Sequence, residues 1–114
     1  MIVLADRDKN YLLRMEEHCI RIEDACKRFG NSLQAFENDA DYRDVICMNI
    51  FQIGEIANQV SDAVKKELND VPWAQMYEIR NILAHAYIKP DNRIVWQTVE
   101  NDIPNLKLKL QEII

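Results

Sequence analysis

"VICMNIFQIGEIANQV", residues 45–60, is the stretch that decides the predicted fold. Its apolar residues are Val45, Met48, Ile50, Phe51, Ile53, Ile56, Ala57 and Val60. On a helix these side chains cover more than half of the circumference, so several neighbouring elements must cover them. We therefore expect this helix, capped at its start by Asp39 or Asp41, to lie at the centre of a helical bundle.

The rest of the chain predicts further helices joined by short loops. A first helix is expected from Asp6 or Asp8 to Phe29, with Gly30 as its stop, followed by one turn that Ser32 begins within residues 31–38. A short helix is expected from Ser61 to Leu68, and a longer one from Pro72 to Tyr87. The last helix is expected from about Arg93 to the end, and Pro104 either kinks it or splits it. Short loops favour antiparallel neighbours. The predicted fold is all-α, an antiparallel bundle of about five helices in a single domain spanning residues 1–114.

Composition agrees with this fold and narrows the classes of function. Only two glycines and three prolines occur among 114 residues, which disfavours a turn-rich all-β fold. The net charge of −5 argues against a broad basic surface for nucleic acid, although a local basic groove stays open. The three cysteines lack metal-ligand spacing and are expected to be reduced thiols. With no signal peptide and no long apolar run, the expected location is cytoplasmic, with no membrane partner.

"RNILAHAY", residues 80–87, holds the candidate site residues. On a wheel of about 100° per residue, Met76, Ile79, Ile82, Leu83 and Ala86 share one face, which we expect to be buried. Arg80 and His85 stand about 140° apart and straddle the polar side. Either Arg80 folds over the small Ala84 to meet His85, or a second copy of the helix supplies the missing group across a two-fold dimer cleft. We favour the dimer.

These two side chains suit the cleavage of RNA. A guanidinium matches phosphate oxygens, and an imidazole can take the proton from a 2′-hydroxyl that then attacks the adjacent phosphate. No carboxylate cluster adjoins the helix, which disfavours a two-metal nuclease, and no cofactor is expected. The same spacing also fits two ordinary exposed residues on a bundle helix, so the residues alone do not decide between the two interpretations.

A longer stretch adds a resemblance. "VPWAQMYEIRNILAHAY", residues 71–87, resembles the signature segment of the HepT-like toxins in the HEPN superfamily, in which arginine, a polar residue, histidine and tyrosine occur in this order. The matching residues are Arg80, Asn81, His85 and Tyr87, with Trp73 opening the helix. The resemblance continues through "NIFQIGEIANQVSD" (49–62) and "IVWQTVENDIPNLK" (94–107), and covers residues 41 to 110 approximately.

The resemblance implies a function and roles for these residues. HepT-like proteins are helical homodimers that include metal-independent endoribonucleases, the toxins of prokaryotic type II or type VII-like toxin–antitoxin systems. By this resemblance His85 is the catalytic base or acid, Arg80 binds the phosphate and the transition state, and Asn81 supports Arg80. Tyr87 resembles the tyrosine to which an MntA-like minimal nucleotidyltransferase, the antitoxin partner, attaches AMP to silence the toxin.

Two alternatives to an RNA-cleaving enzyme stay open. The chain could be a non-catalytic helical adaptor that docks a nucleotidyltransferase and presents Tyr87 or a nucleotide to it, or a purely structural dimerisation bundle. In the central helix, Glu55 is either a buried carboxylate that orients Arg80 or a groove residue, or it occupies a solvated position, and the sequence does not choose between the two. Gly54 beside it would permit a close approach of two helices.

Overall fold

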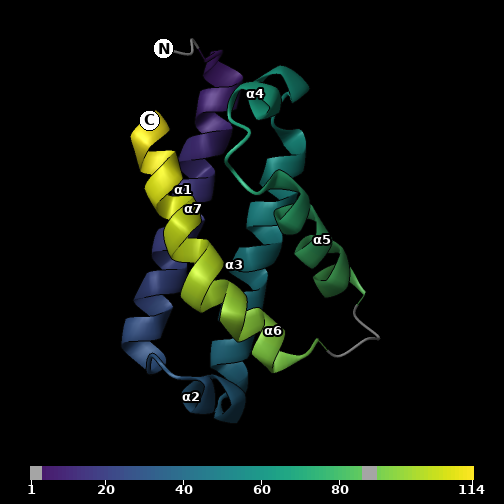
Figure 1. The fold of residues 1–114 in the computed structure, drawn as a ribbon. Coiled ribbons are helices and arrows are strands. Elements are labelled where there is room, and N and C mark those ends of the chain that lie inside the picture. The colour runs from purple at the N-terminus through teal and green to yellow at the C-terminus, as the bar shows by residue number, and fades with distance from the viewer. Residues whose placement is uncertain (1–3, 86–89) are drawn as a thin grey trace.

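The computed structural model describes residues 4–85 and 90–114 and is helical, without strands, over these ranges. Its elements are α1 (Asp6–Phe29), α2 (Leu33–Asn38), α3 (Ala40–Gln59), α4 (Asp62–Glu67), α5 (Trp73–Ala84), α6 (Asn92–Gln97), the π-helical turn η1 (Thr98–Asp102) and α7 (Ile103–Ile113). In Figure 1, α1 and α5 run in one direction, and α3 and α7 in the other. The prediction of an all-α antiparallel bundle is confirmed. None of the described helices is long and apolar enough to cross a membrane.

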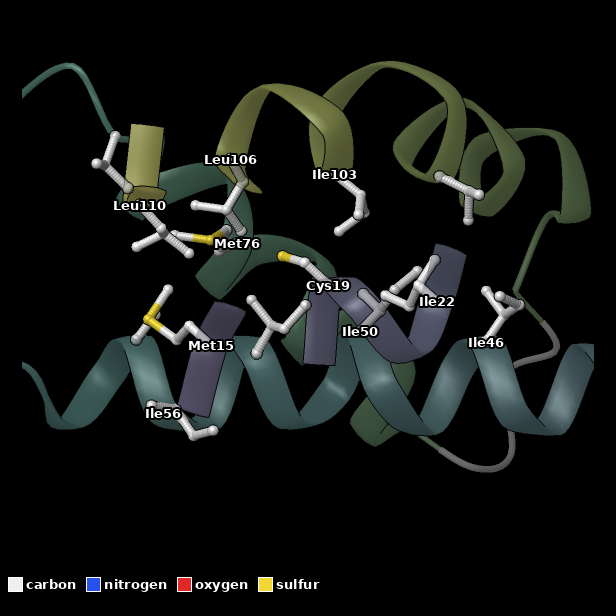
Figure 2. Close-up of a cluster of buried hydrophobic side chains, with 14 of the residues drawn as sticks. Met15, Cys19, Ile22, Ile46, Ile50, Ile56, Met76, Ile103, Leu106 and Leu110 are labelled. Carbon is white, nitrogen blue, oxygen red and sulfur yellow. The ribbon is translucent and has the colours of Figure 1, made fainter. Parts of the chain in front are cut away.

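Helix α3 lies at the centre, as its apolar circumference predicted. It packs against α1 and α5, while α7 packs against α1. The side chains labelled in Figure 2 that fill the space between these helices include Met15, Cys19 and Ile22 of α1, Ile46 and Ile50 of α3, Met76 of α5, and Ile103, Leu106 and Leu110 of α7. Burying one such side chain contributes about 1.5–3 kcal/mol, so this interior is the main source of stability.

Most of the predicted helix ends are confirmed by their capping contacts. The Ser32 hydroxyl accepts a hydrogen bond from the Ala35 amide at 3.1 Å, and the Asp39 carboxylate accepts one from the Asp41 amide at 2.9 Å. Ser61 is the N-cap of α4. Gly30 ends α1 with a φ of 116°, a conformation that residues with a Cβ rarely adopt.

The start of α1 differs from the prediction, because neither Asp6 nor Asp8 is its N-cap. Ala5 takes that position, and Asp8 lies inside the first turn as a buried carboxylate. Its two oxygens accept hydrogen bonds from the Ser61 amide at 3.0 Å and from the Ser61 hydroxyl at 2.9 Å. A buried carboxylate needs such donors. Asp8 therefore links the start of α1 to the loop between α3 and α4 instead of capping its own helix.

Near Pro104 a π-helical turn interrupts the last helix, while the backbone at its junctions keeps right-handed helical dihedral angles. A π-helical turn, η1, separates α6 from α7, and Pro104 lies in the first turn of α7. Proline has no amide hydrogen to donate to the carbonyl of Glu100 four residues earlier, so the regular α-helical bonding cannot pass this point. In the first turn of a helix the main-chain amides have no carbonyl partner within that helix, so a proline there removes no hydrogen bond.

Helices α3 and α5 approach each other closely at Gly54. A Cβ atom built on this glycine would overlap the Cβ of Arg80 and would lie 2.8 Å from the carbonyl oxygen of Met76. Both neighbours belong to α5, and one of them is main chain that cannot move aside without moving the helix. The absence of a side chain at Gly54 therefore sets the distance between the two helices, as the sequence suggested.

Gly54→Ala tests this contact. Because the added methyl group must push α5 away from α3, we expect the free energy of unfolding to fall by about 1–3 kcal/mol in urea titrations followed by circular dichroism. Gln59→Ala, at an exposed position of the same helix, is the control and should change it by less than about 0.5 kcal/mol. A Gly54→Ala protein as stable as the parent would show that the two helices do not need this close contact.

Candidate functional site

Helix α5 is held at its start and along one side, and this places Arg80. The indole Nε1 of Trp73 donates a hydrogen bond to the Leu68 carbonyl at 3.0 Å, which fixes the first turn. Further along, Met76 is buried, and Ile79 and Leu83 are partly buried against the core. Arg80 follows Met76 by one turn, at the edge of this packed side. Its side chain therefore leaves α5 beside α3.

Three contacts hold the guanidinium of Arg80. Its Nε donates a hydrogen bond to Oε1 of Glu55 on α3, forming an ion pair, and its Nη1 donates to Oδ1 of Asn81 at 2.9 Å. The Cζ atom lies 5.4 Å from the centre of the Phe51 ring, a cation–π distance. Neither of these two hydrogen bonds uses Nη2, the third nitrogen of the guanidinium. Two of the three guanidinium nitrogens and one face of the group are thus held.

This arrangement is half-buried rather than enclosed. The side chains of Arg80 and Glu55 are 29% and 38% exposed. Water still reaches both groups, so an incoming anion can reach the guanidinium without first opening the protein. The site therefore combines a cation of fixed orientation with access from solvent.

The sequence prediction for the end of α5 is wrong. The helix was expected to continue to Tyr87, but it ends at Ala84, and the exposed His85 is its C-cap with φ −85° and ψ 81°. Its last turn has little packing, since Ile82, predicted to be buried, is 38% exposed. Helices in proteins persist mainly through tertiary packing, so a turn with few partners ends easily. The φ of His85 stays in the helical range and only its ψ departs, so the wheel still places His85 about 140° from Arg80 but places no residue after it.

The other predicted site residues are only partly described by the structure. Asn81 lies beside Arg80 and hydrogen-bonds to it, as expected of a supporting residue. Tyr87 and Ala86 lie outside the described residues. Seven residues along a continuous helix would return Tyr87 to the direction of Arg80, but α5 ends at Ala84.

Phe51 is the contact that sequence reasoning missed. It was counted only among the apolar residues of the central helix, yet it lies four positions before Glu55, a spacing that places both side chains on one side of α3. Glu55 pairs with Arg80, as one interpretation expected, but its side chain is 38% exposed and not buried. Among the described residues, no group of three or more His, Cys, Asp or Glu side chains is placed to hold a metal ion.

Comparisons with known proteins agree with the motif. The family model described as "Ribonuclease HepT-like" matches residues 15–113. "Probable ribonuclease HepT" of Thermococcus cleftensis is 30% identical, over 71% of this chain and 82% of that protein. "Putative RNase MJ1380" of Methanocaldococcus jannaschii is 28% identical, over 71% of this chain and 83% of that protein. No solved structure gives a significant match.

The family match covers most of the chain, and it includes α3, α5 and every site residue named above. It confirms the resemblance carried by residues 71–87 and by the flanking segments. The chain belongs to the HepT-like ribonuclease family.

Proposed function

We propose that this protein is a metal-independent endoribonuclease, the toxin of a prokaryotic type II or type VII-like toxin–antitoxin system. The observation that carries the proposal is the anchored, solvent-accessible guanidinium of Arg80, with His85 exposed at the end of the same helix. A fixed cation can bind a phosphate and an imidazole can move a proton, and the two together suit the internal cleavage of RNA. Family membership supports the same reaction class.

The mechanism follows from these two groups. The imidazole of His85 takes the proton of a ribose 2′-hydroxyl, and the oxygen attacks the adjacent phosphorus. The bond to the 5′-oxygen breaks, that oxygen takes up a proton, and the products are a 2′,3′-cyclic phosphate and a 5′-hydroxyl. Arg80 stabilises the negative charge that builds on the phosphate oxygens, while Asn81 holds one nitrogen of the guanidinium.

His85→Ala tests the catalytic assignment. Losing the base should slow the cleavage of RNA in EDTA by at least about 10²-fold and abolish growth inhibition in cells. His85 is exposed, so the circular dichroism spectrum and the free energy of unfolding should stay close to those of the parent.

An RNA with 2′-deoxyribose at the cleaved position is the substrate control and should resist the parent protein. Equal cleavage by His85→Ala and the parent would refute the role of His85. A protein that binds a nucleotidyltransferase stably but cleaves no RNA would support the adaptor alternative.

A homodimer is part of the proposal, because Arg80 and His85 stand about 140° apart on one helix and a second copy can supply the missing group. The outer side of α3 bears exposed Val45 and Met48, and Met48 is 59% exposed. Glu55 follows Met48 by seven residues, so this apolar surface adjoins the Arg80 site along one side of α3. A second copy packed there about a two-fold axis would bring both sites into one cleft, because such an interface pairs the same patch of each subunit.

Met48→Glu tests the dimer. A charge at the centre of the contact should convert the dimer to monomer in sedimentation or light-scattering measurements, and RNA cleavage should fall with it. Leu108→Glu is the matched control, because Leu108 is 58% exposed but lies on α7. A monomeric parent, or a Met48→Glu protein that stays dimeric, would exclude this surface as the interface.

An MntA-like minimal nucleotidyltransferase is the proposed antitoxin, and Tyr87 the residue to which it attaches AMP. Tyr87 follows His85 by two residues in the sequence. A nucleotidyl group there adds bulk and negative charge close to the catalytic histidine. It would compete with the phosphate of RNA for Arg80, which explains how one modification could silence the enzyme.

Intact mass spectrometry after incubation with such a partner and ATP tests the modification. The parent should gain one or more AMP units and lose RNA cleavage, whereas Tyr87→Phe should gain none and stay active. Tyr77→Phe is the matched control, since Tyr77 is an exposed tyrosine of α5 and its loss should leave the modification intact. A Tyr87→Phe protein that is still modified would place the target elsewhere.

A further inference from the structure

We propose that Glu55 is a positioning residue of the site: it holds the guanidinium of Arg80 by its Nε edge and so directs the remaining nitrogens toward the phosphate. This inference rests on the proposed function. It assigns to α3 a part in the reaction that the motif on α5 does not contain. The observations behind it are the ion pair, the Phe51 ring contact and the close approach at Gly54.

The geometry restricts Arg80 from three sides. At Gly54 the main chain of α3 touches the root of the Arg80 side chain, so the first carbons have little freedom. The Phe51 ring covers the cationic carbon, and the Glu55 carboxylate takes the Nε hydrogen. Asn81 takes one hydrogen of Nη1. An arginine offers five N–H groups, and the two hydrogen bonds made to described residues leave the Nη2 hydrogens and one Nη1 hydrogen for phosphate oxygens.

Stability does not explain the presence of Glu55. Ion pairs that are this accessible to water contribute only about 0–1 kcal/mol. A carboxylate beside a phosphate site also repels the substrate, in a protein whose net charge is already −5. Glu55 speeds the cleavage of RNA if the gain from orienting Arg80 exceeds the loss of attraction between the site and the phosphate. Misplacing a catalytic group by about 1 Å can slow a reaction about 10²-fold.

Substitutions of Glu55 separate orientation from charge. Glu55→Ala removes the acceptor, and we expect kcat for RNA cleavage to fall by about 10- to 100-fold. Glu55→Gln keeps an oxygen that accepts the Nε hydrogen but removes the charge. It should restore most of kcat and lower KM, because the repulsion of phosphate is lost. Equal losses in both variants would show that charge matters and orientation does not, and would overturn the proposal.

A second ion pair of the same kind is the control. Glu23 of α1 pairs with Lys107 of α7 at 2.8 Å, and these side chains are 34% and 24% exposed, close to the values for Glu55 and Arg80. Glu23→Ala breaks a link between two helices without touching the site, so kcat and KM should match the parent. If Glu23→Ala loses as much activity as Glu55→Ala, the effect of Glu55 is general destabilisation and the proposal fails.

A double-substitution cycle shows whether Glu55 acts through Arg80. In an Arg80→Ala background, Glu55→Ala should cause no further loss of kcat, because the group that it positions is gone. A further loss of about the same size as in the parent would mean that Glu55 acts independently, and would overturn the positioning role.

Nuclear magnetic resonance of the Arg80 Nε–H group tests the same idea without RNA. In the parent and in Glu55→Gln this group should be rigid on the picosecond–nanosecond timescale, and in Glu55→Ala it should be mobile. If the parent cleaves no RNA, the proposed function fails, and the resonance measurement alone then decides whether Glu55 holds Arg80. Equal rigidity in all three proteins would refute the positioning role even if the parent is an active nuclease.

Discussion

The contact between the main chains of α3 and α5 at Gly54 is the constraint on which the site depends. Helix α5 packs mainly on α3, and its last turn has little cover, as the exposed Ile82 shows. Its position relative to the bundle therefore follows from a small number of contacts. Because no Cβ separates the helices at Gly54, Arg80 begins close enough to α3 to reach Glu55 and Phe51. The orientation of the cation is thus set by helix packing.

Sequence reasoning succeeded where the signal is local. Ser32, Asp39 and Gly30 mark helix ends by hydrogen bonds or dihedral angles within a few residues, and the structure contains all three as predicted. It failed where a residue far away in the sequence determines the contact. Asp8 has the chemistry of a cap but binds Ser61. The end of α5 has no glycine or proline signal, so its position at Ala84 could not be read from residues 80–87.

In the site, too, the sequence predicted what is local to the motif and not the contacts made by distant residues. The residue types of the motif identified the family and the candidate catalytic groups, since a family signature is a property of sequence. The contacts of those groups were not accessible, because the wheel describes one helix alone and assumed that it continues to Tyr87. The partners of Arg80 on α3 lie 25 and 29 positions earlier in the chain, and only packing brings them together. Only the four-residue spacing of Phe51 and Glu55, which places both side chains on one side of α3, indicated from the sequence that the two could share a partner.

The link between Asp8 and Ser61 bears on how the chain acquires its fold. The two residues are 53 positions apart, and the hydrogen bonds between them close a loop that contains α1, α2 and α3. Closing a loop of this length is opposed by chain entropy, so the link can form only after α1 and α3 have been made and have met. During synthesis, the carboxylate in the first turn of α1 has no partner until Ser61, 53 residues later, has been added to the chain.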